Sequence, residues 1–194
     1  MSKKLQEHLG SFHDNGIYLA TRSIDVTGEF NIELYEKCLK NLHALDSSTG
    51  NINIFINSEG GEVETLMAIF DLVRGCRNHV RALVYGSVHS SASLLLQACD
   101  ERLMSPNSYM MIHKGTDGSA ELHPTAKARW DKHSKKVGKW MYDTYLEKIR
   151  EKQPKYTKSQ LTKILEHDTI LYPQDCIDLG LADKIEERFF YDTK

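Results

Sequence analysis

Serine residues follow a glycine at one point of this sequence, in a pattern that could generate a nucleophile. The segment Gly86-Ser-Val-His-Ser-Ser-Ala-Ser93 places Ser90 where a helix is expected to begin. A serine at a sharp strand-to-helix turn exposes its hydroxyl, and the positive end of the helix dipole favours negative charge that develops there. Serine is also a common helix N-cap, so the local pattern leaves both interpretations open.

A second turn carries paired glycines, in the segment Asn57-Ser-Glu-Gly-Gly61. Glycines after a buried strand let the backbone come close to a bound group and present N–H groups to an oxyanion. A glycine pair is also common in turns that have no chemical role. The segment is therefore a candidate oxyanion hole only if a nucleophile lies beside it.

A serine nucleophile needs a base, and the sequence contains nine histidines. His113 differs from the others because it ends the apolar run Met110-Met-Ile-His113, which indicates a buried strand. Asp168, just ahead of Ile170-Leu171, could orient that histidine. The order of the three residues along the chain does not identify a triad, since triads are recognised by geometry.

The elements that must position these residues alternate between strands and helices. Strands are expected at 17–19, 51–57, 81–86, 102–105 and 108–113. Helices are expected at 31–45, about 63–75, about 91–98, about 125–152, from 157 onward and at 173–180. The order predicts an α/β fold of βαβ units on a largely parallel sheet. Because functional groups collect at the carboxyl ends of parallel strands, both turns and His113 should meet at one edge.

Composition narrows the class of protein. The chain has 194 residues, 40% of them hydrophobic, and a net charge of −2. These values exclude a disordered chain and disfavour a dedicated nucleic-acid binder. The apolar runs are too short to span a bilayer, and no signal-peptide pattern follows the first lysines. Four widely spread cysteines without a CxxC pair disfavour a zinc ribbon or a disulfide framework and fit a reducing, cytoplasmic compartment.

Four segments together resemble one family. From about residue 17 to 185 the chain resembles the Clp protease proteolytic subunit (ClpP) family of serine peptidases, which have a crotonase-like fold. The segments are Ile56-Asn-Ser-Glu-Gly-Gly61, Gly86-Ser-Val-His-Ser90, Pro106-Asn-Ser-Tyr-Met-Met-Ile-His113, and Asp168 through Gly180-Leu-Ala-Asp183. The resemblance implies an α/β, ClpP/crotonase-like fold of repeated β-β-α and βαβ units. It also implies a single peptidase domain at 16–194, with a protruding handle helix at about 122–153. Residues 1–15 are polar and mixed in charge, which predicts a separate N-terminal segment, either a tail or a short docking helix.

The resemblance also implies a role for each candidate residue. Ser90 would be the nucleophile, His113 the general base and Asp168 the orienting acid, while Gly61 and Ser91 would supply the oxyanion N–H groups. It implies no cofactor and no metal. The implied partners are a peptide or protein substrate, other copies in a ring or double ring, and an AAA+ unfoldase, with no nucleic acid or membrane.

The sequence departs from the family pattern beside the nucleophile and in the glycine turn. Glu59 replaces a proline of the family motif. Ser91 is a rival nucleophile and His89 a rival base, because both adjoin Ser90. Two other functions are open: a crotonase-like acyl-CoA enzyme, which shares the fold and the glycine oxyanion hole, and an inactive ring subunit that scaffolds active copies.

Overall fold

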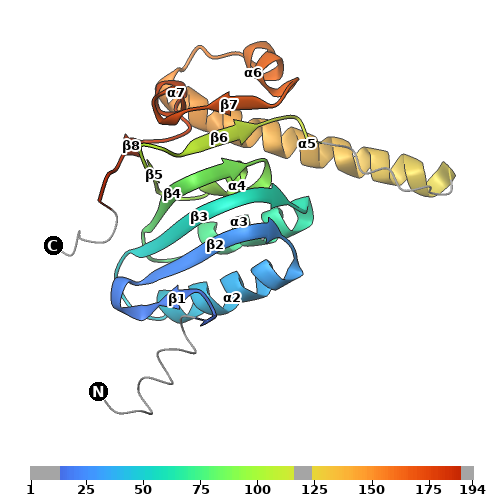
Figure 1. The fold of residues 1–194 in the computed structure, drawn as a ribbon. Helices are drawn as coiled ribbons and strands as arrows, with labels where there is room; N and C mark the ends of the chain where they lie inside the picture. The colour runs from blue at the N-terminus through green and yellow to red at the C-terminus, as the bar shows by residue number, and fades with distance from the viewer. Residues whose placement is uncertain (1–13, 116–123, 189–194) are drawn as a thin grey trace, which may run out of the picture.

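An eight-stranded sheet forms the centre of the computed structural model, which describes residues 14–115 and 124–188 (Figure 1). The strands are β1 Ile17–Tyr18, β2 Ser23–Phe30, β3 Ile52–Gly61, β4 Val80–His89, β5 Glu101–Met104, β6 Tyr109–Ile112, β7 Thr169–Leu171 and β8 Lys184–Ile185. Their order is β1-β2-β3-β4-β5-β8, with β6 beside β4 and β7 beside β6. The β1–β2 and β6–β7 ladders are antiparallel and the others are parallel. The predicted α/β fold with a largely parallel sheet is confirmed.

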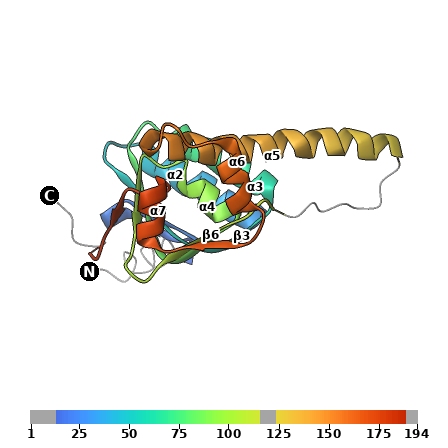
Figure 2. The same cartoon turned by 90° about the horizontal axis from the view of Figure 1, so that it is seen from above.

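Helices connect the parallel strands and cover one face of the sheet (Figures 1 and 2). They are the 3-10 helix η1 Leu19–Thr21 and the α-helices α2 Ile32–Asp46, α3 Val63–Arg74, α4 Ser91–Leu96, α5 Pro124–Lys152, α6 Lys158–Leu165 and α7 Pro173–Leu179. The helices α2, α3 and α4 lie against the sheet. The longest, α5, extends well beyond the body of the molecule (Figure 2).

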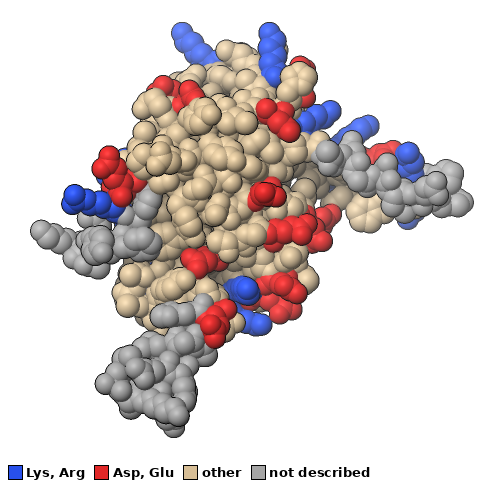
Figure 3. Space-filling view, in the orientation of Figure 1, with Lys and Arg blue, Asp and Glu red and all other residues tan. Residues whose placement is uncertain are grey.

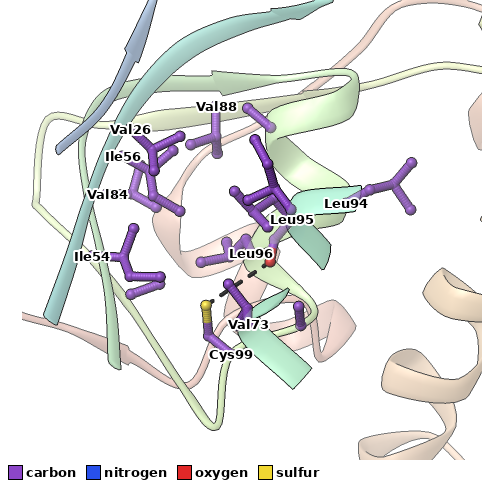
Figure 4. Close-up of a cluster of buried hydrophobic side chains, with 14 of the residues drawn as sticks. Val26, Ile54, Ile56, Val73, Val84, Val88, Leu94, Leu95, Leu96 and Cys99 are labelled. Atoms are coloured by element: carbon purple, nitrogen blue, oxygen red, sulfur yellow. Dashed lines mark hydrogen bonds between the residues drawn. The ribbon is translucent and has the colours of Figure 1, made fainter. Parts of the chain in front are cut away.

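The main hydrophobic core lies between the sheet and these helices. Figure 4 shows the part of it where β2, β3 and β4 meet α4. The buried side chains there include Val26, Ile54, Ile56, Val84, Val88, Leu95 and Leu96. Each buried side chain of this size stabilises the fold by about 1.5–3 kcal/mol. Because α4 is held in this way, Ser90 is fixed in its place between the end of β4 and the start of α4.

The helix boundaries follow the capping signals of the sequence. Thr157 forms a capping box with Gln160 at the start of α6. Pro173 occupies the first turn of α7, and Gly180 ends that helix with a left-handed φ of 92°. The start of α6 and both ends of α7 are therefore as predicted.

Two strands run further than expected. The strand predicted at 51–57 continues to Gly61, and that predicted at 81–86 continues to His89. The expectation that Ser58-Glu-Gly-Gly61 breaks its strand is therefore wrong. After a register shift, Gly60 and Gly61 pair with the end of β2, so tertiary pairing absorbs the glycines as an irregularity within the strand. The strands β2, β7 and β8 had not been predicted.

Three of the four cysteines are buried, and Cys76 is half-buried. Burial raises the pKa of Cys38 and of Cys99 to about 12. These thiols therefore behave as small hydrophobic side chains. Within the described ranges, no helix combines the length and the apolar character that crossing a membrane requires. Most of the N-terminal segment predicted at 1–15 lies outside the described residues, as does the start of the handle helix predicted at about 122–153.

Candidate active site

Ser90 lies in the turn between β4 and α4, in a backbone conformation that few residues adopt. Its φ is 49° and its ψ is −118°. Such a conformation is strained for a residue with a Cβ atom and persists only where the surroundings impose it. The Ser90 N–H donates to the carbonyl of Met111 (2.9 Å), and the Ser90 carbonyl accepts from the Ser93 N–H (3.0 Å) and the Ser93 hydroxyl (2.6 Å). The Ser90 side chain makes no capping bond to α4, so the helix-cap alternative is wrong.

His113 comes directly after β6. The strand β6 pairs in parallel with the end of β4. His89 is the register partner of Met111, so Ser90 and His113, which follow the two strands, lie close together. The Nε2 atom of His113 lies 2.8 Å from the Ser90 hydroxyl oxygen. At this distance a neutral histidine can accept the hydroxyl proton directly.

Asp168 reaches His113 from the other side because β7 pairs antiparallel with β6. Thr169 is the register partner of Ile112, so Asp168, just before β7, lies across from His113, just after β6. The Asp168 Oδ1 is 3.4 Å from the His113 Nδ1, longer than a good hydrogen bond. The Asp168 side chain is 73% exposed, so water weakens its pull on the histidine. The structure thus brings the three predicted residues together, with the carboxylate held least firmly.

The glycine pair at the end of β3 packs directly against the turn that holds Ser90. A Cβ atom on Gly60 would lie 2.7 Å from the His89 carbonyl oxygen and 2.9 Å from the Ser91 nitrogen. The Ser91 hydroxyl donates to the Gly61 carbonyl at 2.8 Å. The predicted oxyanion residues Gly61 and Ser91 are therefore neighbours across two chain segments.

The two rival residues have other contacts. The Ser91 side chain is buried and bonded to Gly61, whereas the Ser90 hydroxyl faces His113. The His89 ring packs at 5.1 Å from the ring of Tyr109, and its buried Nε2 has no hydrogen-bond partner among the residues that the structure describes. The geometry therefore favours Ser90 and His113 over the rivals.

Sequence reasoning missed three residues that support the site, namely Ser58, Ser93 and Tyr145. The Ser58 hydroxyl donates to the Gly28 carbonyl and accepts from the Gly60 N–H (3.0 Å). The Tyr145 hydroxyl lies 2.7 Å from the Ser93 hydroxyl, which donates to the Ser90 carbonyl; the tyrosine is therefore the donor. A polar residue in a buried strand position could have indicated Ser58. No local pattern links Tyr145 to a serine 52 positions away.

A serine hydroxyl on a strained strand-to-helix turn, in contact with a histidine that lies near a carboxylate, is typical of serine hydrolases. A family model described as Clp protease matches residues 11–189. The chain belongs to the Clp protease family, and it is accordingly a hydrolase of the serine endopeptidase class. The resemblance seen in the four sequence segments is thus confirmed, as is the fold that it implied.

Relatives in three bacteria are similar over most of the chain. The ATP-dependent Clp protease proteolytic subunit 2 of Treponema denticola is 30% identical over 172 residues, which cover 87% of this chain and 83% of the relative. The ATP-dependent Clp protease proteolytic subunit of Deinococcus radiodurans is 30% identical over 171 residues, covering 86% and 81%. That of Ligilactobacillus salivarius is 30% identical over 174 residues, covering 86% and 84%.

Proposed function

We propose that this endopeptidase cleaves peptide bonds with Ser90 as nucleophile, His113 as general base and Asp168 as the residue that orients the histidine. The contact of 2.8 Å between the Ser90 hydroxyl and the His113 Nε2 carries the proposal. The strained Ser90 backbone supports it, because strain of this kind is concentrated at functional sites.

In the first step Ser90 attacks the carbonyl carbon of the scissile bond while His113 takes its hydroxyl proton. The carbonyl oxygen becomes an oxyanion, which the N–H groups of Gly61 and Ser91 stabilise. Loss of one such donor costs about 3–4 kcal/mol of transition-state stabilisation. His113 then protonates the leaving amine, and water, activated by the same histidine, hydrolyses the acyl-enzyme.

Asp168 stabilises the imidazolium that forms on His113 and keeps its Nδ1 pointed away from Ser90. The separation of 3.4 Å and the exposure of the carboxylate make this a weak interaction in an isolated chain. We therefore assign Asp168 a smaller share of the rate than Ser90 or His113.

The substrate is a peptide or protein, and the working form is a homo-oligomeric ring or double ring. Exposed aromatic side chains support assembly: Trp130 on α5 is 53% exposed and Tyr172 is 64% exposed. The face in Figure 3 combines a broad area without charged side chains with several acidic groups, most of them along its right and lower parts. Tyr85 is a further exposed aromatic side chain of a kind suited to contact with another protein. The relatives are named as ATP-dependent, and we propose an AAA+ unfoldase as the partner that delivers folded substrates.

The test combines a fluorophosphonate probe with hydrolysis of a short peptide that carries an aminocoumarin leaving group. We expect mass spectrometry to locate the probe on Ser90, and Ser90→Ala and His113→Ala to abolish hydrolysis without loss of the folded state. Labelling of Ser91 in place of Ser90, or full activity of His113→Ala, would contradict the assignment. Binding of an acyl-CoA thioester without peptide hydrolysis would favour the crotonase-like alternative.

Assembly is tested by native mass spectrometry of the purified protein. We expect a closed ring or a multiple of it, and light scattering should agree. A stable monomer near the chain mass of 22.2 kDa would refute the ring. An assembled particle that neither binds the probe nor cleaves peptide would support the scaffolding alternative.

A further inference from the structure

The two proposed oxyanion donors come from separate segments of the chain. Gly61 ends β3, while Ser91 begins α4 after the turn that follows β4. A transition-state oxygen must lie within about 3 Å of both N–H groups at once. The distance between the two segments therefore has to be fixed to a few tenths of an ångström.

The sheet does not fix this distance by itself. In the β3–β4 ladder the register shifts after Ile56, and the last paired residues are Ser58 and Val88. Beyond that pair, Gly60 and Gly61 are in register with the end of β2, on the side away from β4. The Glu62 N–H donates to the Phe30 carbonyl (2.9 Å), which also holds this segment to β2.

Packing limits how closely the glycine segment can approach the nucleophile turn. The space for a Cβ atom on Gly60 is already filled by the His89 carbonyl oxygen, the Ser91 nitrogen and the Ser90 Cβ. Contact of this kind resists compression, but it gives little resistance to separation. A directional bond across the gap is needed to hold the two segments together.

We propose that the Ser91 side chain is a positioning residue, whose hydroxyl holds the Gly61 carbonyl and so fixes the spacing of the two oxyanion donors. The hydroxyl donates to that carbonyl at 2.8 Å, and the residue is 1% exposed. A buried hydroxyl must find an acceptor, and this one bridges the end of β3 and the start of α4. The role belongs to the side chain and is separate from that of the Ser91 N–H.

This inference rests on the proposed function, because it assumes that Ser90 is the nucleophile. Ser91→Ala leaves the backbone N–H in place but removes the bond that sets its distance from Gly61. The two N–H groups then stabilise the oxyanion less well, whereas the binding of the substrate in its ground state is unchanged. We expect kcat to fall about tenfold, the change that loss of one ordinary hydrogen bond produces, with KM within about twofold.

Ser108→Ala provides the matched control. Ser108 is also 1% exposed, and its hydroxyl donates to the Ser105 carbonyl at 2.8 Å. Both variants lose one buried hydroxyl bond, so thermal unfolding should show similar losses of stability. Only Ser91→Ala should lose kcat, and only it should bind a peptide boronate, which mimics the tetrahedral intermediate, about tenfold more weakly.

Two further variants keep the test decisive if Ser91→Ala folds poorly. Ser91→Thr retains the hydroxyl and should recover most of kcat, while Ser91→Cys keeps the volume but offers a weak donor and should not. If the wild-type protein is labelled on Ser90 but Ser91→Ala and Ser91→Cys match the kcat of Ser108→Ala, the positioning role is refuted and the proposed function stands. If the wild-type protein is not labelled on Ser90, the proposed function itself has failed.

Discussion

Replacement of Gly60 by alanine should separate the chemistry of the site from the stability of the fold. Gly60 has a φ of +89°, which alanine adopts only with strain. Its added Cβ would lie 2.7 Å from the His89 carbonyl oxygen, 2.9 Å from the Ser91 nitrogen and 3.0 Å from the Ser90 Cβ. Two of these atoms belong to the backbone of the nucleophile turn and cannot move aside by a change of rotamer.

The expected loss of folding stability in Gly60→Ala has two parts. The left-handed backbone costs about 1–2 kcal/mol. The steric overlap adds about 1–3 kcal/mol, as in other overpacked sites. The larger effect should fall on the reaction, because the turn that must yield carries Ser90 and the Ser91 N–H. If the shift removes one oxyanion donor from useful distance, kcat falls about 100- to 1000-fold.

Gly28→Ala is the control, since Gly28 has a similar φ of +79° but open space where the Cβ would lie. In both variants the strained backbone should lower the free energy of unfolding, which is measured by urea unfolding at one protein concentration. Only Gly60→Ala should lose peptide hydrolysis and reaction with the fluorophosphonate probe. If the two variants hydrolyse peptide at rates within about threefold of each other, the steric argument is wrong.

Three other predictions follow from single contacts. Asp168→Asn should leave kcat about a hundredfold higher than Ser90→Ala does, because the carboxylate is exposed and only orients the histidine. Backbone N–H donation, chiefly from Asn78, lowers the pKa of Asp46 to about 2; its stabilisation is therefore complete above about pH 4 and lost as the pH falls toward 2. Urea unfolding should accordingly show Asp46→Asn about 1–2 kcal/mol less stable than the wild type at pH 6 and nearly equal to it at pH 2. Burial raises the pKa of Tyr145, which keeps its hydroxyl a donor to Ser93, and Tyr145→Phe should lower the free energy of unfolding by about 1 kcal/mol in the same assay.

The meeting of Ser90 and His113 could be predicted because it follows from a rule of parallel sheets. Both residues come directly after apolar strands, and parallel neighbouring strands end at the same edge. The boundaries of α7 were predictable for a local reason, since proline and glycine have positional preferences that need no tertiary partner.

The course of β3 could not be predicted from local signals. Paired glycines usually end a strand, yet here Gly60 and Gly61 pair with β2, whose own strand was not predicted. The exposure of Asp168 was equally hidden, because it depends on how β7 and the residues before it are covered. The contact between Tyr145 and Ser93 joins α5 to α4, and such contacts exist only once the helices have packed.

The extra serines beside Ser90 have a physical explanation other than rival chemistry. The strained backbone of Ser90 costs about 1–3 kcal/mol. The Ser93 hydroxyl bond to the Ser90 carbonyl and the Ser91 hydroxyl bond to Gly61 each contribute about 0.5–1.5 kcal/mol, so the two offset a cost of this size. A turn flanked by small apolar residues would keep its backbone hydrogen bonds and its packing but would lose these two hydroxyl bonds. In this chain, the hydroxyl groups of Ser91 and Ser93 are bonded to the carbonyls of Gly61 and Ser90, so they help to hold the turn in its strained conformation.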